Sequence, residues 1–454
     1  MRQEQLRDVV VLEGADMKSW VVAATLVAAV ICGLRLWMPA PEDGQGDSPA
    51  IGGGNGQELS SPEAVFPSLR RETDTAEEKP LDQARPAAST DAPRSAELDA
   101  ALAVYRQGKH AEAARLLAPL VERGVGLPGS RVFLAAAALE SGDYATARAA
   151  AGRAAAEGEA ASWRIEGEAL KLHCDLREGS LTRAAVLDRA RARLAELANS
   201  PSGRLLLQDL VDRSVADNAG ADGVRLAQAA IEQVARSVQG QPAFARVRGL
   251  AASLEKAERA VLFDRRSTVW ATRAKIGTGE PLVRLVTRLR KESQAGRYDA
   301  HFLAWVNGIA DPGRVQAGRE LVIPPGDLAI EVFRGSRLVL VYCGEYLVRV
   351  HGCAIGRTEK PTPVGSFEIG EKIERPVWHG PNGAVAYAKP ENPLGEGWLG
   401  FVDRPDATGY GIHGTNDEGS IGEEASEGCV RLYNAAIVEL MAWVAPKGTQ
   451  VTIH

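Results

Sequence analysis

Alanine dominates the chain between residues 101 and 200, where it accounts for 27 of the residues. Alanine loses no side-chain entropy in a helix, so this stretch is predicted to be helical and closely packed. Two segments inside it are alike, because Gly108 and Gly142 are 34 residues apart and each is followed by similarly spaced alanines. A third and looser unit turns at Gly179. Helical patterning continues beyond these units, so residues 96–265 are predicted to be all-α.

The spacing of these segments resembles that of tetratricopeptide repeats, which are helix pairs with a period of 34 residues. Arrays of this kind bind other proteins, so the resemblance implies a protein partner for residues 96–265. A plain alanine-rich helical bundle is the alternative interpretation. No residue that would bind a partner can be named from the sequence.

The N-terminal region contains one long apolar segment. Residues 19–38 carry a single charged residue, Arg35, near one end, and they are long enough to cross a bilayer. We therefore predict a cytoplasmic N-terminus at 1–18, a single-pass signal anchor in the inner (cytoplasmic) membrane, and the remainder in the periplasm or cell envelope. A cleaved signal peptide and a lipoprotein modified at Cys32 are the alternatives. Residues 39–95, rich in Pro and Gly, are predicted to be a disordered linker.

Residues 271–325 follow a different pattern, in which two helix-like segments are flanked by short strands. The sequences LAWVNG at 303–308 and GRELVIP at 318–324 resemble the second half of a LysM domain. This small β-α-α-β family binds glycans that contain N-acetylglucosamine, such as peptidoglycan. The first half departs from the family, because GEP at 279–281 stands where Gly-Asp-Thr is usual. The resemblance implies a LysM-like domain that either holds peptidoglycan glycan strands or keeps the fold with altered affinity.

Residues 328–454 consist of short β-branched segments separated by glycine-containing turns, which predicts a mostly-β domain. The whole chain is therefore predicted to be multidomain, with a transmembrane helix, all-α repeats, a β-α-α-β domain and this C-terminal domain.

Charge and cysteine content exclude several function classes. The chain has 53 basic and 59 acidic residues, a net charge of −6, so we expect no nucleic-acid binding through bulk positive charge. The five cysteines are scattered and form no C-x-x-C pattern, which disfavours a disulfide framework or a structural zinc site. A single disulfide between Cys343 and Cys353 stays open, and His379 is a candidate for lining a cleft.

One run in the β domain, residues 409–434, contains residue types suited to nucleophilic chemistry. It holds His413 and Cys429, 16 residues apart. A thiolate is a strong nucleophile, and an imidazole can remove the thiol proton. Gly428 removes side-chain bulk beside the cysteine, so backbone N–H groups there can point at a developing oxyanion. On spacing alone, a single cysteine and a single histidine in a strand-rich domain are more often structural than catalytic.

The surrounding motifs resemble those of the L,D-transpeptidase (YkuD-type) catalytic domain. They are HGT at 413–415, SIG at 420–422 and SEGCVRL at 426–432, preceded by TPVGSF at 362–367 and NPLG at 392–395. The resemblance covers about residues 328–454. It implies a mostly-β fold with the nucleophile in a cleft.

The resemblance also implies an activity. In this family, a cysteine attacks the carbonyl of the third residue of a peptidoglycan stem tetrapeptide, and D-Ala leaves. An acceptor amine then resolves the thioacyl-enzyme into a 3→3 cross-link, with no metal or organic cofactor. An L,D-carboxypeptidase that uses water, attachment of a protein to the wall, and a non-catalytic wall-binding scaffold are the alternatives. Carried over by motif, the roles are Cys429 as nucleophile, His413 as general base, Gly414 as the carbonyl that orients His413, Gly428 as oxyanion-hole backbone, and Ser426, Arg431, Tyr410 and Trp398 as substrate-binding residues.

One position of the motif departs from the family, because Glu427 stands where many members have His. Together with Glu423 and Glu424 it adds negative charge near the thiol, in a domain with 11 basic and 16 acidic residues. Like charge raises the pKa of a cysteine. We nevertheless predict that Cys429 and His413 form a thiolate pair.

Overall fold

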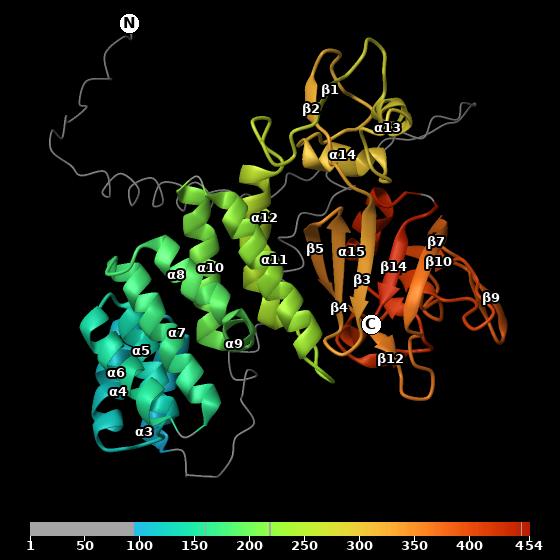
Figure 1. Ribbon diagram of the computed structural model, residues 1–454. Helices are drawn as coiled ribbons and strands as arrows, with labels where there is room; N and C mark the ends of the chain where they lie inside the picture. Colours follow the sequence, from blue (N-terminus) through green and yellow to red (C-terminus); the bar gives the residue numbers. More distant parts are fainter. Residues whose placement is uncertain (1–94, 159, 218, 446) are drawn as a thin grey trace, which may run out of the picture. The chain divides into compact units, whose positions relative to one another are not determined.

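The computed structural model describes residues 95–158, 160–217, 219–445 and 447–454 (Figure 1). The predicted cytoplasmic N-terminus, the predicted membrane anchor and nearly all of the predicted linker lie outside these residues. Across the part of the chain that the structure describes, no helix combines the length and the apolar character that crossing a bilayer requires.

The N-terminal part of the described chain is helical, as predicted. Its helices are α3 (Ala96–Arg106), α4 (His110–Glu122), α5 (Gly129–Glu140), α6 (Tyr144–Glu157), α7 (Ala161–Glu178), α8 (Arg183–Ala192), α9 (Leu194–Asn199), α10 (Pro201–Ala216), α11 (Gly220–Ser237) and α12 (Phe244–Val261). Side-chain caps begin several of them. Ser95 Oγ accepts from the Leu98 N–H at 3.2 Å, and the Asp143 carboxylate accepts from the Thr146 N–H at 3.1 Å. These oxygens satisfy amides that have no partner within the first helical turn.

Three glycines occupy corresponding turns of the helical region. Gly108 lies between α3 and α4, Gly142 between α5 and α6, and Gly179 between α7 and α8. Their φ angles are +74°, +82° and +81°, a left-handed conformation that glycine adopts without a steric penalty. The 34-residue spacing in the sequence therefore corresponds to one helix pair.

Residues 271–325 have the predicted β-α-α-β order. The elements are β1 (Arg273–Lys275), α13 (Leu282–Lys291), α14 (Ala300–Val306) and β2 (Glu320–Val322), and β1 pairs with β2 antiparallel. The side chain of Asn307 ties the end of α14 to β2. It donates to the carbonyls of Leu303 and Val322, each at 2.9 Å, and accepts from the Val322 N–H at 2.8 Å.

The C-terminal domain is built on an eight-stranded sheet in the order β13-β11-β10-β7-β14-β3-β4-β5. Its strands are β3 (Leu328–Phe333), β4 (Leu338–Cys343), β5 (Tyr346–Gly352), β7 (Gly365–Glu374), β10 (Gly397–Phe401), β11 (Gly411–His413), β13 (Val430–Arg431) and β14 (Gln450–Ile453). Two smaller pairs are β6 (Ile355–Gly356) with β12 (Glu424–Ser426), and β8 (Trp378–Gly380) with β9 (Gly383–Val385). Helix α15 (Asn434–Trp443) follows β13. The prediction of a mostly-β domain is confirmed.

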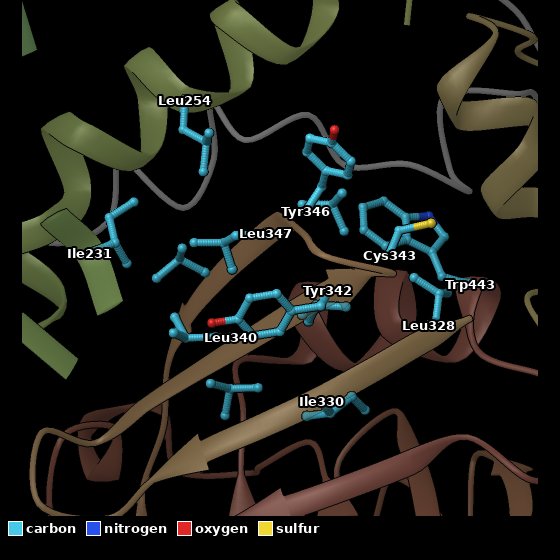
Figure 2. Packing of buried hydrophobic residues seen from close by; sticks show 14 of the residues in the cluster. Ile231, Leu254, Leu328, Ile330, Leu340, Tyr342, Cys343, Tyr346, Leu347 and Trp443 are labelled. Atoms are coloured by element: carbon cyan, nitrogen blue, oxygen red, sulfur yellow. The ribbon is translucent and has the colours of Figure 1, made fainter. Parts of the chain in front are cut away.

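One hydrophobic core joins the helices to this sheet. Buried residues form a continuous cluster from α7 to the C-terminal strand, through the β-α-α-β domain. Figure 2 shows Ile231 of α11 and Leu254 of α12 close to Leu347 of β5. Every residue of β4 and of β5 is buried, as expected for strands covered on both faces. A second cluster of buried residues lies within α3–α7, so the core that reaches the sheet extends only from α7 onward.

Polar contacts close the edge of the sheet at β5. The Gln228 side chain, on α11, accepts from the Leu347 N–H at 3.1 Å and donates to the Glu345 carbonyl at 2.9 Å. A further contact lies away from β5, where Ser336 Oγ, in the turn between β3 and β4, donates to the Ala235 carbonyl of α11 at 2.8 Å. A helix side chain thus takes the place of a neighbouring strand.

The disulfide that the sequence left open is not formed, because Cys343 and Cys353 are both free thiols. Both are fully buried, and burial raises the pKa of each to about 12. They behave as small apolar core residues.

Candidate active site

Strand pairing brings three of the predicted site residues to one face of the sheet. Trp398 of β10 lies opposite His413 of β11, and His413 lies opposite Arg431 of the parallel strand β13. Cys429 directly precedes β13, and its Sγ lies 3.9 Å from the carbonyl oxygen of Gly409, two residues before β11. Residues far apart in the sequence therefore converge at the end of the sheet formed by β10, β11 and β13.

His413 is held in a single orientation and is neutral. It is only 4% exposed, and its Nδ1 lies 2.6 Å from the Gly414 carbonyl oxygen. A carbonyl can only accept, so Nδ1 carries the hydrogen and Nε2 keeps its lone pair. Burial lowers the pKa of His413 to about 4, although the bond to Gly414 acts in the opposite direction. A neutral imidazole can accept a proton at neutral pH, and the Gly414 carbonyl fixes its orientation.

Cys429 is half-buried and protonated at neutral pH. Burial raises the pKa of its thiol to about 11, while the Gly411 N–H and the positive charge of Arg431 lower it by less. Sγ lies 3.9 Å from the Gly409 carbonyl oxygen, to which the thiol donates. Both pKa shifts disfavour the predicted thiolate pair in the resting state, in which the thiol is protonated and the imidazole is neutral. Burial disfavours the charged form of both groups.

The acidic residues near the motif are balanced by basic partners. Glu427 forms ion pairs with Arg357 and, at 2.8 Å, with Lys360. Glu424 pairs with Arg337 at 2.9 Å. The expected effect of this negative charge on the thiol is therefore offset, and burial is the main cause of the raised pKa of Cys429.

Ser426 holds the nucleophile loop together. It is 1% exposed, its Oγ donates to the Cys429 carbonyl at 2.6 Å, and it accepts from the Gly428 N–H at 3.1 Å. The donor hydrogen and one lone pair of the hydroxyl are thus used by backbone groups, and the role of Ser426 in substrate binding stays a prediction. The same bond occupies the Gly428 N–H that was predicted to form part of an oxyanion hole.

Gly428 has a steric role instead. Its φ is +113°, and a Cβ at this position would lie 2.5 Å from Cε1 of Tyr410. Only glycine fits there, because any side chain would meet the tyrosine ring and strain the backbone. Tyr410 therefore packs against the backbone just before the nucleophile, as a wall of the site.

The two remaining predicted residues differ in their partners. Trp398 stacks on His413 with ring centroids 5.8 Å apart, and its Nε1 donates to Glu371 at 2.8 Å. Nε of Arg431 is buried with no hydrogen-bond partner among the described residues. Arg431 as a whole is half-buried, and its role in substrate binding stays a prediction.

The sequence did not reveal the side chains that pair with the acidic residues of the site, because these partners lie far away along the chain. Arg337, Arg357 and Lys360 carry no motif and meet the acidic residues only in the folded chain. Asn434 follows the motif at the start of α15, where asparagine is ordinarily read as a helix cap. His379 lies exposed on β8.

Comparison with known proteins identifies relatives of this domain. The family profile "L,D-transpeptidase catalytic domain" matches residues 327–453. The L,D-transpeptidase-family protein YqjB of Bacillus subtilis is 37% identical over 130 residues, which cover 28% of this chain and 72% of that protein. Its counterpart YkuD of Bacillus licheniformis is 33% identical over 181 residues, which cover 38% of this chain and 94% of that protein. The NMR structure of the catalytic domain from E. faecium L,D-transpeptidase is 25% identical, covers 28% of this chain and 97% of that chain, and gives a TM-score of 0.24. No LysM or tetratricopeptide profile matches.

Proposed function

Because the chain belongs to the L,D-transpeptidase (YkuD) family, we propose that it joins peptidoglycan stem peptides through 3→3 cross-links. Its L,D-transpeptidase catalytic domain supplies acyl-transfer chemistry. The proposal rests most on one observation: the Nδ1 hydrogen of a neutral His413 is committed to Gly414, and the Cys429 thiol lies 3.9 Å from the Gly409 carbonyl oxygen, just before the strand that carries His413.

The first half-reaction forms a thioacyl-enzyme. As Cys429 Sγ attacks the carbonyl of the third stem residue, the thiol proton moves to His413 Nε2, so no free thiolate accumulates. The tetrahedral intermediate collapses, the peptide bond to D-Ala breaks, and the imidazolium returns the proton to the leaving amine. The products are a thioester on Cys429, free D-Ala and a neutral His413.

The second half-reaction regenerates the thiol. The amine of an acceptor stem attacks the thioester while His413 removes one of its protons. The thioester bond breaks, the sulfur recovers the proton from the imidazolium, and the new amide is the cross-link. Arg431 places a positive charge near Cys429, so we assign it to a carboxylate of the donor stem.

Mass spectrometry of the products tests the acceptor. The purified full chain, incubated with muropeptides that contain tetrapeptide stems, is expected to give a 3→3 dimer with loss of D-Ala. Loss of D-Ala alone would instead identify an L,D-carboxypeptidase. No product, and no adduct of Cys429 with a carbapenem, would identify a wall-binding scaffold.

Alkylation tests the protonation state of the nucleophile. Because the pKa of Cys429 is raised to about 11, iodoacetamide should label it no faster than a free thiol at pH 7, and the rate should climb as pH rises toward 11. Peptide mapping separates Cys429 from the buried thiols. Rapid labelling at pH 6 that does not increase with pH would show a thiolate pair instead.

The β-α-α-β domain is proposed to hold glycan strands of the same substrate. Its antiparallel β1–β2 pair and the helices between them support this assignment. Glu280, in the GEP segment that departs from the family, is already bound within the domain, by Arg288 at 3.0 Å and by the Gly277 N–H at 2.9 Å. Co-sedimentation of the full chain with insoluble peptidoglycan, with and without soluble glycan competitor, tests it. Sedimentation that the competitor leaves unchanged would contradict it.

The helix pairs α3–α8 are proposed to be tetratricopeptide-like repeats that dock a partner protein. The recurrence of a left-handed glycine turn at one-pair intervals supports a repeat architecture. Cross-linking of the full chain in membranes tests for a partner. Deletion of α3–α6 with no change in the cross-linked species would contradict it.

Residues 19–38 are proposed to anchor the protein in the inner (cytoplasmic) membrane, with the catalytic domain in the periplasm. The uninterrupted apolar run before Arg35 supports this location. Resistance of the full chain to extraction by alkaline carbonate tests it, and release into the soluble fraction would contradict it.

A further inference from the structure

Asn434 makes three hydrogen bonds to segments outside its own helix. It is the first residue of α15, and its Oδ1 accepts from the Glu396 N–H at 3.0 Å and from the Thr415 N–H at 3.2 Å. Its Nδ2 donates to the Thr415 carbonyl at 2.7 Å. A capping side chain would accept from the amides of its own first turn. The Asn434 side chain is instead directed to the loop that follows His413.

The bond to the Thr415 N–H connects Asn434 to the catalytic base. That N–H and the Gly414 carbonyl belong to one peptide group, which is planar and rigid. Fixing the N–H end therefore fixes the direction of the carbonyl that accepts from His413 Nδ1 at 2.6 Å. Hydrogen bonds at both ends of one peptide polarise each other. A continuous chain thus runs from Asn434 through the peptide to the imidazole.

The surroundings of Asn434 leave no space for an alternative arrangement. A Cβ at Gly414 would lie 2.3 Å from Asn434 Oδ1, and a Cβ at Gly395 would lie 2.2 Å from the same atom. Gly414 and Thr415 are both buried. The amide side chain therefore fills the contact between the 394–396 and 413–415 segments, where two glycines admit it.

We propose that Asn434 is the positioning residue of the catalytic histidine, and this rests on the proposed function of His413 as base. The side chain holds the 414–415 peptide so that Nδ1 stays protonated and Nε2 faces the thiol. When His413 accepts the thiol proton, the same peptide dipole stabilises the imidazolium. The residue acts through His413 and does not touch substrate.

Two variants of the full chain test this inference. Asn434→Ala is expected to lower the rate of Cys429 acylation by a carbapenem about 100-fold, the effect of a small misplacement of a catalytic group. Asn434→Asp keeps an acceptor for both amides and adds a negative charge, which favours the imidazolium. The pKa of His413, followed by NMR of the ring nitrogens, should therefore rise above its wild-type value in Asn434→Asp and fall in Asn434→Ala.

Asn416→Ala is the matched control, because Asn416 lies in the same loop but donates to the Pro390 carbonyl at 2.6 Å and is exposed. It should leave both the rate and the His413 titration unchanged. A purely structural role for Asn434 would lower thermal stability and leave the His413 titration unmoved, and that result would overturn the proposal. If Asn434→Ala fails to fold, the direction of the shift in Asn434→Asp decides.

The readouts are independent of the natural acceptor. A chain that forms no 3→3 dimer but shows both His413 shifts would refute the cross-linking proposal and keep the positioning role. A chain that forms the dimer but shows no shift of the His413 pKa in the variants would support the cross-linking proposal and refute the positioning role of Asn434.

Discussion

Replacing Cys429 by alanine should abolish both cross-linking of muropeptides and adduct formation with a carbapenem, a loss of about 10³-fold or more. The reason is that every covalent step passes through Sγ, which no neighbouring group can replace. Cys174→Ala is the matched control, because this thiol is buried in α7 and lies outside the catalytic domain. It should retain activity, measured as dimer formation by mass spectrometry.

His413→Ala should behave differently from Cys429→Ala as pH rises. At pH 7 it loses the base that removes the thiol proton, so acylation falls by a similar factor. Because the thiol itself ionises with a pKa of about 11, the rate should recover roughly tenfold per pH unit toward that value, while Cys429→Ala stays inactive. A flat pH profile in His413→Ala would argue against His413 as the base.

Replacing Arg349 by alanine should produce the largest loss of stability, about 3 kcal/mol or more. Arg349, on β5, is 7% exposed. Its guanidinium pairs with Glu439 of α15 at 3.0 Å and with Glu255 of α12 at 3.4 Å. It also lies 4.6 Å from the ring centre of Trp305 and 5.0 Å from that of Trp443. One side chain therefore joins the helical region, the β-α-α-β domain and the catalytic domain.

The loss arises mainly from the groups that Arg349 leaves behind. Glu258 of α12 is 1% exposed, burial raises its pKa well above the usual range, and Arg349 is the nearby charge that acts most strongly against that rise. Without Arg349, Glu439 and Glu255 also lose a partner at a largely buried site.

Urea unfolding of the full chain measures the effect, and Arg259→Ala is the matched control. Arg259 lies over the same Trp305 ring at 5.3 Å, but its side chain is 47% exposed. Its removal should therefore change the free energy of unfolding by less than about 1 kcal/mol. Equal losses in the two variants would show that the ring contact, and not the buried charge, stabilises this junction.

The sequence predicted best the features that depend on neighbours along the chain. The helices and the β-α-α-β order follow from local periodicity, and the catalytic domain follows from contiguous motifs. The protonation state of Cys429 did not follow, because burial outweighs nearby charge, and the basic partners of Glu424 and Glu427 come from distant segments.

The shared core also escaped prediction, for a physical reason. Arg349 meets Glu255 and Glu439 across separations of about ninety residues, and nothing in the periodicity of either segment specifies such a pair. Asn434 is similar, because its three partners lie on two loops that only the fold brings together. Long-range polar contacts of this kind leave no repeating pattern in a single sequence.

The closure of β5 by Gln228 has a consequence for aggregation. An open edge strand exposes a row of unpaired backbone groups, which another chain can extend into a larger sheet. Here the amide of Gln228, which lies 117 and 119 residues before the backbone groups that it binds, occupies part of that row. The catalytic domain thus depends on an upstream helix to keep its sheet from recruiting a second copy. Protection against edge-to-edge association is carried by a segment that takes no part in the chemistry.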